Sequence, residues 1–147
     1  MCSRAGGNTQ SDTRRRRRPG LPPAREHEVR TDWTRAEIGA LFDLPHAETH
    51  AVLLPHTIAY NTPAAPDAIG HAARALGAAD AADGLFDLSA KLGAPRSLAE
   101  IGMPEDGIAK AAALATRNPY WNPRPIEERG IADLLKRAWS GARPHAG

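Results

Sequence analysis

Apolar residues recur every three or four positions through most of this chain, in segments that Gly and Pro separate. Four such segments follow residue 65, and in each the apolar residues fall on one face of a helix. The predicted faces are Ile69, Ala72, Ala73 and Leu76; Leu85, Leu88 and Leu92; Ile108, Ala111, Ala112 and Ala115; and Ile131, Leu134, Leu135, Ala138 and Trp139. The sequence has neither the alternating pattern of a strand nor an internal repeat. It therefore predicts an all-α fold, a partial helical bundle.

Turn-forming and capping residues give the expected helix boundaries. Pro66 and Asp67 suit the start of the first helix, and Gly77 suits the position after its end. Asp83 is the expected N-cap of the second helix. The expected starts of the other two helices are Pro104, and either Pro123 or Pro125. A glycine inside the last helix, Gly130, costs about 1 kcal/mol relative to Ala.

Charge divides the chain into two unlike parts. Residues 1–41 carry nine Lys or Arg against five Asp or Glu, whereas residues 42–147 carry ten against twelve. We therefore expect a disordered, basic, Pro- and Arg-rich N-terminal tail over residues 1–40 and a helical domain over residues 41–143. Because the excess of basic residues lies on the tail and not on the fold, we expect no nucleic-acid partner.

The run Arg14–Arg18 leaves two interpretations open. It is either a solvated charge run or a segment that contacts phosphates or a membrane surface. No apolar stretch long enough for a signal peptide or a membrane span accompanies it, so we expect no membrane partner. Cys2 is the single cysteine, which excludes an intramolecular disulfide. These features favour a cytoplasmic location.

Three of the six histidines lie within residues 42–61, in a run of mostly apolar or small residues. His46 and His50 are four positions apart, about 40° around a helix, so both rings can reach one ligand. Such a pair supplies half of a metal site. The alternative is structural, with His46 capping the helix and His50 hydrogen-bonded inside a core. His56 is expected to face elsewhere, unless Pro55 kinks the helix.

Residues 42–61 resemble the signature of the iron-containing alcohol dehydrogenase family, in which a His after Pro opens a helix that runs through Leu-Leu-Pro-His and ends at Asn. Within that family, the variant His-Ala-Glu-Thr-His is similar to the maleylacetate reductases. The similarity continues in Tyr60–Pro66, Gly84–Leu88, Lys91–Pro95, Ile101–Gly107 and Asn118–Pro125. The resemblance implies the C-terminal helical domain of a two-domain enzyme whose N-terminal α/β domain binds NADH or NADPH.

The resemblance also implies a site of which this chain keeps a part. His46 matches a metal ligand of the family and is the predicted metal-binding residue, for iron or zinc. His50 is the predicted catalytic residue. Two further histidine ligands of the family fall on Asp32 and Ala36, and Ala36 has no donor atom. We therefore expect weak metal binding, and no cofactor-binding residue is predicted because no strand leads into a Gly-rich turn.

The segment Asn118–Pro125 has two interpretations. Tyr120 and Trp121 line a pocket while Arg124 pairs with a substrate carboxylate, or the segment is structural. In the structural interpretation, which we favour, Asn118 and Asn122 end or cap helices, the prolines stiffen the connection, and Tyr120 and Trp121 fill the core.

Three hypotheses for function follow. The chain is an inactive remnant of a reductase that converts maleylacetate, a small-molecule substrate, to 3-oxoadipate in the breakdown of aromatic compounds. Alternatively, it is one half of a split reductase whose cofactor-binding domain is a separate chain. The third hypothesis is a helical binding module without enzymatic activity. Because helices that would cover the fold in the resembled enzymes are missing, we also expect uncovered apolar surface that favours self-association.

Overall fold

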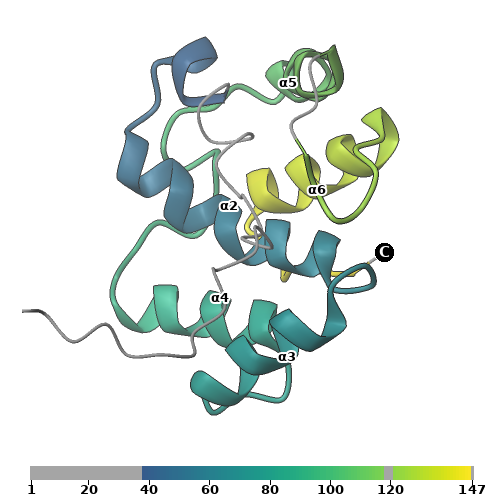
Figure 1. Cartoon of the computed structure of the whole chain (residues 1–147). Helices are drawn as coiled ribbons and strands as arrows, with labels where there is room; N and C mark the ends of the chain where they lie inside the picture. The colour runs from purple at the N-terminus through teal and green to yellow at the C-terminus, as the bar shows by residue number, and fades with distance from the viewer. Residues whose placement is uncertain (1–37, 118–120, 147) are drawn as a thin grey trace, which may run out of the picture.

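The computed structural model describes residues 38–117 and 121–146, and these residues form helices joined by turns and loops, without a strand. Residues 38–42 are helical, and five longer helices follow (Figure 1). Their bounds are α2 His46–Asn61, α3 Pro66–Ala75, α4 Ala81–Lys91, α5 Gly107–Arg117 and α6 Glu128–Ser140. The predicted all-α fold is confirmed.

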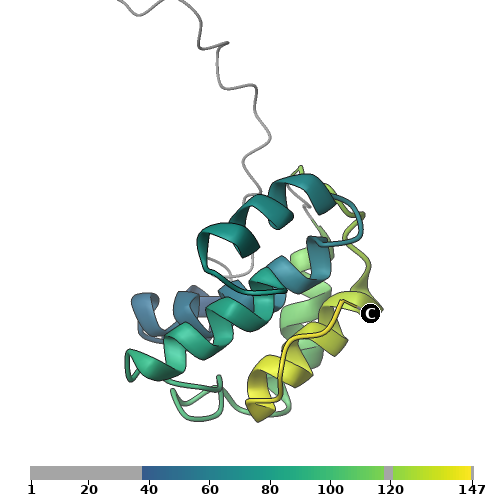
Figure 2. The same ribbon diagram turned by 90° about the horizontal axis from the view of Figure 1, so that it is seen from below.

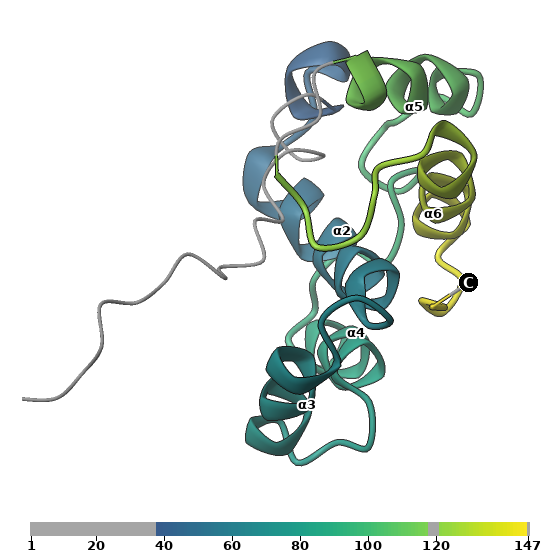
Figure 3. The ribbon, with the colours of Figure 1, turned by 45° about the vertical axis from the view of Figure 1, so that its right-hand side comes forward.

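Helix α2 is the central element of the fold. It packs against α4 on one side and against α6 on another, while α5 packs on α6 and α3 packs on α4. Figure 3 shows α3 and α4 at one end of the described part, α5 and α6 at the other, and α2 between them; Figure 2 gives the same arrangement from below. The helix runs without interruption through Pro55, which is buried inside it.

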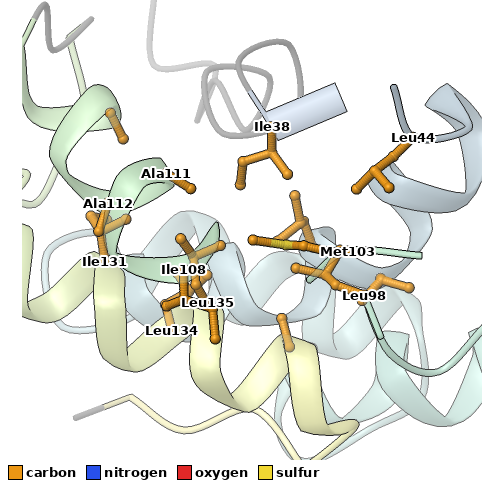
Figure 4. Packing of buried hydrophobic residues seen from close by; sticks show 14 of the residues in the cluster. Ile38, Leu44, Leu98, Met103, Ile108, Ala111, Ala112, Ile131, Leu134 and Leu135 are labelled. Carbon is orange, nitrogen blue, oxygen red and sulfur yellow. The ribbon is translucent and has the colours of Figure 1, made fainter. Parts of the chain in front are cut away.

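The main core lies where α2, α5 and α6 meet (Figure 4). Its buried residues are Ile38, Leu44, Val52, Leu53, Tyr60, Leu98, Met103, Ile108, Ala111, Ala112, Ala115, Ile131, Leu134, Leu135 and Ala138. The loop before α5 is joined to the end of α6 by three hydrogen bonds. Trp139 Nε1 donates to the Met103 carbonyl at 2.9 Å. The amides of Leu98 and Ala99 donate to the carbonyls of Ala138, at 3.0 Å, and of Trp139, at 3.4 Å.

A smaller cluster lies between α3 and α4. Its buried residues are Ile69, Ala73 and Ala81, and its partly buried neighbours are Ile58, Ala65 and Ala72. Helix α3 starts at Pro66 as predicted, and Gly77 follows it with a φ of 64°, in the left-handed region that favours glycine at a helix end.

The predicted apolar faces of α3, α5 and α6 are confirmed in their buried members, but the face predicted for α4 is wrong. Phe86, Ala81 and Ala82 are the buried residues of α4, whereas Leu88 is 40% exposed and Leu92 is 76% exposed. Helix α4 meets its neighbours through a face that Phe86 and small residues form, because alanine allows backbones to approach closely.

The expected N-cap of α4 is also wrong by three residues. Asp80 has an extended backbone and its carboxylate accepts a hydrogen bond from the Asp83 amide at 3.0 Å, the geometry of an N-cap. Asp83 therefore lies in the first turn, where its charge favours the helix dipole. The last helix likewise starts at Glu128, later than either proline expected to open it.

Close packing against Tyr60 explains why a glycine occurs at position 130, inside α6. A Cβ atom at this position would lie 3.0 Å from Cε2 and 3.3 Å from the hydroxyl of Tyr60. The glycine thus lets α6 approach the end of α2 closely, which offsets its low helix propensity.

Several predictions fall outside the described residues. These are the tail over residues 1–37 and its run Arg14–Arg18, together with Cys2, Asp32, Ala36, Asn118 and Tyr120. The predicted end of the disordered tail at residue 40 is wrong, because residues 38–40 are helical and Ile38 is buried in the main core. Within residues 38–117 and 121–146, no helix combines the length and apolar character that a membrane span needs.

Candidate functional site

The two histidines of the predicted site lie in the first two turns of α2. His46 is the first residue of the helix and is exposed, and His50 is half-buried one turn later. The N-cap position is Pro45 and no side chain caps the helix, so the interpretation of His46 as a capping residue is wrong. Gly39 lies beside His46, since a Cβ on it would be 3.9 Å from His46 Nδ1. Both histidines thus lie at the start of α2, and His46 lies next to the helical residues 38–42.

The described residues do not form a metal site by themselves. In residues 38–117 and 121–146, no group of three or more His, Cys, Asp and Glu side chains is close enough to hold an ion. His46 and His50 supply two nitrogens at most, which leaves a tetrahedral or octahedral shell incomplete. A tightly held iron or zinc ion does not fit the part of the site described here.

The third histidine of α2 lies in a different environment. His56 is 2% exposed, and its ring meets the Phe86 ring edge-on at a centroid distance of 6.3 Å. Its Nε2 atom is buried and has no hydrogen-bond partner among the described residues. Burial, assisted by the positive charge of Arg137, lowers the pKa of His56 to about 4. The imidazole is therefore neutral at neutral pH.

His56 and Tyr60 line a cleft of about 630 Å³ between α2, α6 and the segment that follows α6. The charged groups along it are Arg124, Glu127, Arg129, Asp133, Lys136 and Arg137. Neither His46 nor His50 belongs to its lining. Reasoning from the sequence missed this cleft, although the helical spacing of the charged residues between Arg129 and Arg137 places them on the exposed face of α6.

Arg124 is held in place at one side of the cleft. Its Nη1 donates to the Tyr60 carbonyl at 3.1 Å and to the Ala146 carbonyl at 3.0 Å, and its guanidinium stacks 4.4 Å from the centre of the Tyr60 ring. The Tyr60 hydroxyl in turn donates to the Pro125 carbonyl. These contacts tie the connection before α6 to the end of α2.

Asn122 extends the same connection. Its side-chain amide donates to Asn61 Oδ1 at 2.8 Å and to the Arg124 carbonyl at 2.6 Å, so the capping role predicted for it is wrong. Trp121 is 57% exposed and lies outside the lining of the cleft. Within the described residues, the structural interpretation is therefore wrong for Asn122 as a helix cap and for Trp121 as a core residue. Arg124 both holds the connection in place and faces the cleft.

Comparison with known proteins identifies the class. The C-terminal model of the Fe-containing alcohol dehydrogenase family matches residues 34–139, so the chain belongs to this family. Maleylacetate reductase of Sphingobium indicum is 59% identical over 107 residues, which cover 73% of this chain and 30% of the relative. Maleylacetate reductase of Burkholderia cepacia is 52% identical with the same coverage.

The fold agrees with the sequence match. The crystal structure of maleylacetate reductase from Agrobacterium tumefaciens aligns with a TM-score of 0.75 and 54% identity, over 78% of this chain and 32% of that one. The predicted resemblance to the C-terminal helical part of such enzymes is confirmed. The chain spans about 30% of the length of the relatives it matches.

Proposed function

We propose that this chain supplies the helical portion of a reductase that acts on maleylacetate with NADH or NADPH. The observation that carries the proposal is the 59% identity to a maleylacetate reductase along 107 residues. An identity of this order over the whole matched helical region supports a shared substrate class as well as a shared fold. Residues 41–143, together with the helical residues 38–40 that precede them, would form the helical domain.

The reaction is the addition of two electrons and two protons to a carbon–carbon double bond. When bound by the complete enzyme, a reduced nicotinamide would supply a hydride to one carbon and a proton would reach the other, which would give 3-oxoadipate and the oxidised nicotinamide. We assign to His50 the role of donating a proton or binding a substrate carboxylate, because it lies one turn into α2 and is half-buried. Among the described residues, His46 is the one that would contribute a ligand to a divalent metal.

The 147-residue chain alone is proposed to be inactive. The matched region is 30% of the relatives, and the residues described here form neither a nicotinamide site of strand-and-glycine type nor a complete metal site. Without a protein site that holds the hydride donor against the substrate, the proximity contribution to catalysis is lost. The same coverage favours, as second candidate, a split reductase completed by a separate chain.

The test is complementation. The chain is mixed or co-expressed with the portion of the Sphingobium indicum reductase that precedes the matched region, and oxidation of NADH or NADPH is followed with maleylacetate. We expect no turnover from either part alone and measurable turnover from the two together. His50→Gln should reduce that turnover by about 100-fold or more, the usual contribution of a general acid.

The control variant is His71→Gln, which changes an exposed histidine on α3 and should leave turnover unaltered. Turnover by the chain alone, above a no-protein control, would show that it is not inactive. Two parts that associate on a sizing column yet give no turnover would overturn the proposed function.

A further inference from the structure

The segment that follows α6 turns back across the fold. Gly141 is the C-cap of α6, and its φ of 71° lies in the left-handed region that favours glycine at a helix end. The Ala142 amide donates to the Arg137 carbonyl at 3.0 Å, which closes the turn. Figure 2 shows this segment, in yellow, turning back at the end of α6. We call residues 142–146 the strap; it follows the region that the family model matches, which ends at residue 139.

Two polar anchors hold the strap. At the first, the Arg143 guanidinium pairs with the carboxylates of Asp87, at 2.7 Å, and of Asp83, at 3.1 Å. At the second, the Ala146 carbonyl accepts a hydrogen bond from Arg124 Nη1 at 3.0 Å. The strap therefore links the end of α6 both to α4 and to the connection that precedes α6.

Both anchors lie at the surface. The Arg143 side chain is 57% exposed, and those of Asp83 and Asp87 are 52% and 48% exposed. Exposed ion pairs contribute little to stability, and salt screens them. No residue of the strap is buried, so burial of apolar area adds little to these contacts. The forces that hold the strap against the fold are therefore weak enough to be broken locally while the helices stay packed.

The strap closes one side of the cleft between α2 and α6. His145 and Ala146 of the strap line this cleft together with His56. The Phe86 ring, which meets the His56 ring edge-on, also lies 5.4 Å from the Arg143 guanidinium. His56 Nε2 is buried without a hydrogen-bond partner among the described residues. Solvent that enters when the strap opens can hydrogen-bond to this atom, which offsets part of the loss of the anchors.

We infer that residues 142–146 are a movable strap, which closes the cleft at His56 and opens when the contacts of Arg143 with α4 break. In the closed position, Arg124 donates a hydrogen bond to the strap. Opening frees this donor and admits solutes to His56. The inference does not rest on the proposed reductase activity.

The experiment measures how fast diethyl pyrocarbonate modifies His56 in the 147-residue chain at neutral pH. Peptide mass spectrometry separates His56 from His71, an exposed histidine of α3 that serves as internal reference. Because His56 is neutral at this pH, its rate of modification reports access and not protonation. We expect His56 of the wild type to react much more slowly than His71.

Variants and salt test the first anchor. Arg143→Gln should raise the rate at His56 about three- to tenfold, the scale of two exposed ion pairs, and Asp87→Asn should raise it less. Salt at about 1 M should raise the rate in the wild type and leave Arg143→Gln almost unchanged, because it screens the same pairs. Arg117→Gln is the matched control, at an exposed arginine of α5 outside the cleft lining, and should have no effect.

Amide hydrogen exchange distinguishes opening of the strap from unfolding of the whole chain. The amide of Leu135, whose side chain is 0% exposed in the main core, should exchange equally slowly in the wild type and in Arg143→Gln. Equal acceleration at Leu135 and at His56 would show that Arg143 stabilises the entire fold, and would overturn the inference. A rate at His56 that neither Arg143→Gln nor salt changes would overturn it as well.

Discussion

The two clusters of buried residues differ in what fills them. Where α2, α5 and α6 meet, large branched side chains such as Ile131, Leu134 and Leu135 interlock with alanines of α5, and many are almost fully buried. Between α3 and α4, the buried residues are one large side chain, Ile69, and two alanines, with the partly buried Ile58 of α2 packed against them. Two larger apolar residues, Leu88 of α4 and Leu92 at its C-cap, are exposed and lie outside the cluster.

The difference shows two ways of burying a helix face. In the main core, the free energy of folding comes from area removed from water and from close packing of large groups. In the smaller cluster, small residues let the helices approach but remove little apolar area per residue. Stability should therefore concentrate in the main core, and α3 with α4 should open more readily.

The largest effect expected is from emptying the main core. Leu135 has an exposed fraction of 0%, so Leu135→Ala should lower the free energy of unfolding by about 3 to 5 kcal/mol, through lost burial and a cavity that closes incompletely. Ile69→Ala in the smaller cluster should cost about 2 kcal/mol, because a site bounded by alanines on the surface collapses more easily.

Urea denaturation of both variants, with Leu92→Ala as control, measures the contrast. Leu92 is 76% exposed, and its truncation should change the free energy of unfolding by less than about 0.5 kcal/mol. Equal losses for Leu135→Ala and Ile69→Ala would mean that the two regions are one cooperative core of uniform strength.

His56 of α2 lies between the two regions. Its ring contacts Phe86 of α4, and the positive charge of Arg137 on α6 helps to lower its pKa. Its pKa is about 4 in the folded chain and 6.5 by its ordinary value. Between these values the unfolded chain takes up a proton and the folded chain does not, so stability falls as the pH falls. The loss begins near pH 6.5 and is complete below pH 4, at about 3 kcal/mol.

Two measurements check this linkage. Proton titration of the wild type should give a pKa well below 6.5 for the His56 ring, and His56→Gln should remove the corresponding part of the pH dependence of unfolding. His71→Gln, on the exposed side of α3, should leave it unchanged. A His56 ring that titrates near its ordinary pKa would contradict both the burial and the expected loss.

The sequence predicted the apolar faces of α3, α5 and α6 from helical spacing, but not that of α4. On α4 the leucines suggested the wrong face, because apolar character alone does not say whether alanine or leucine meets a neighbour. The prediction of the N-cap of α4 was wrong for a similar reason. Asp80 and Asp83 are both suitable N-cap residues, and the choice between them depends on where α4 packs.

The candidate site was predictable only in its local part. The spacing of His46 and His50 places both at the start of α2, and the structure agrees on the helix that carries them. The cleft at His56 was not predictable, because it is formed by Tyr60 of α2, Arg124 of a loop and α6, which lie far apart in the sequence. Such long-range placement depends on tertiary packing rather than on any local pattern.

The smallest expected effect is that of replacing a helical glycine by alanine, which should change the free energy of unfolding in opposite directions in the two regions. Gly130 of α6 faces Tyr60, whose hydroxyl is hydrogen-bonded and whose ring lies under Arg124, so the ring has little freedom to move. Gly130→Ala should therefore destabilise the chain by about 1 kcal/mol, because crowding exceeds the gain in helix propensity. Gly70 of α3 has wider surroundings, since the nearest atom, Arg74 Nη1, is 3.6 Å from the position that an alanine Cβ would take.

Gly70→Ala should accordingly stabilise the chain by up to about 1 kcal/mol through helix propensity alone. Urea midpoints of the two single variants and of the double variant measure both effects, which should be additive because the sites do not share a contact. If Gly130→Ala were as stabilising as Gly70→Ala, the close approach of α6 to Tyr60 would not be a constraint of the fold. A loss at Gly130 together with a gain at Gly70 would show that the main core is tightly packed against added volume, while the exposed face of α3 accepts it.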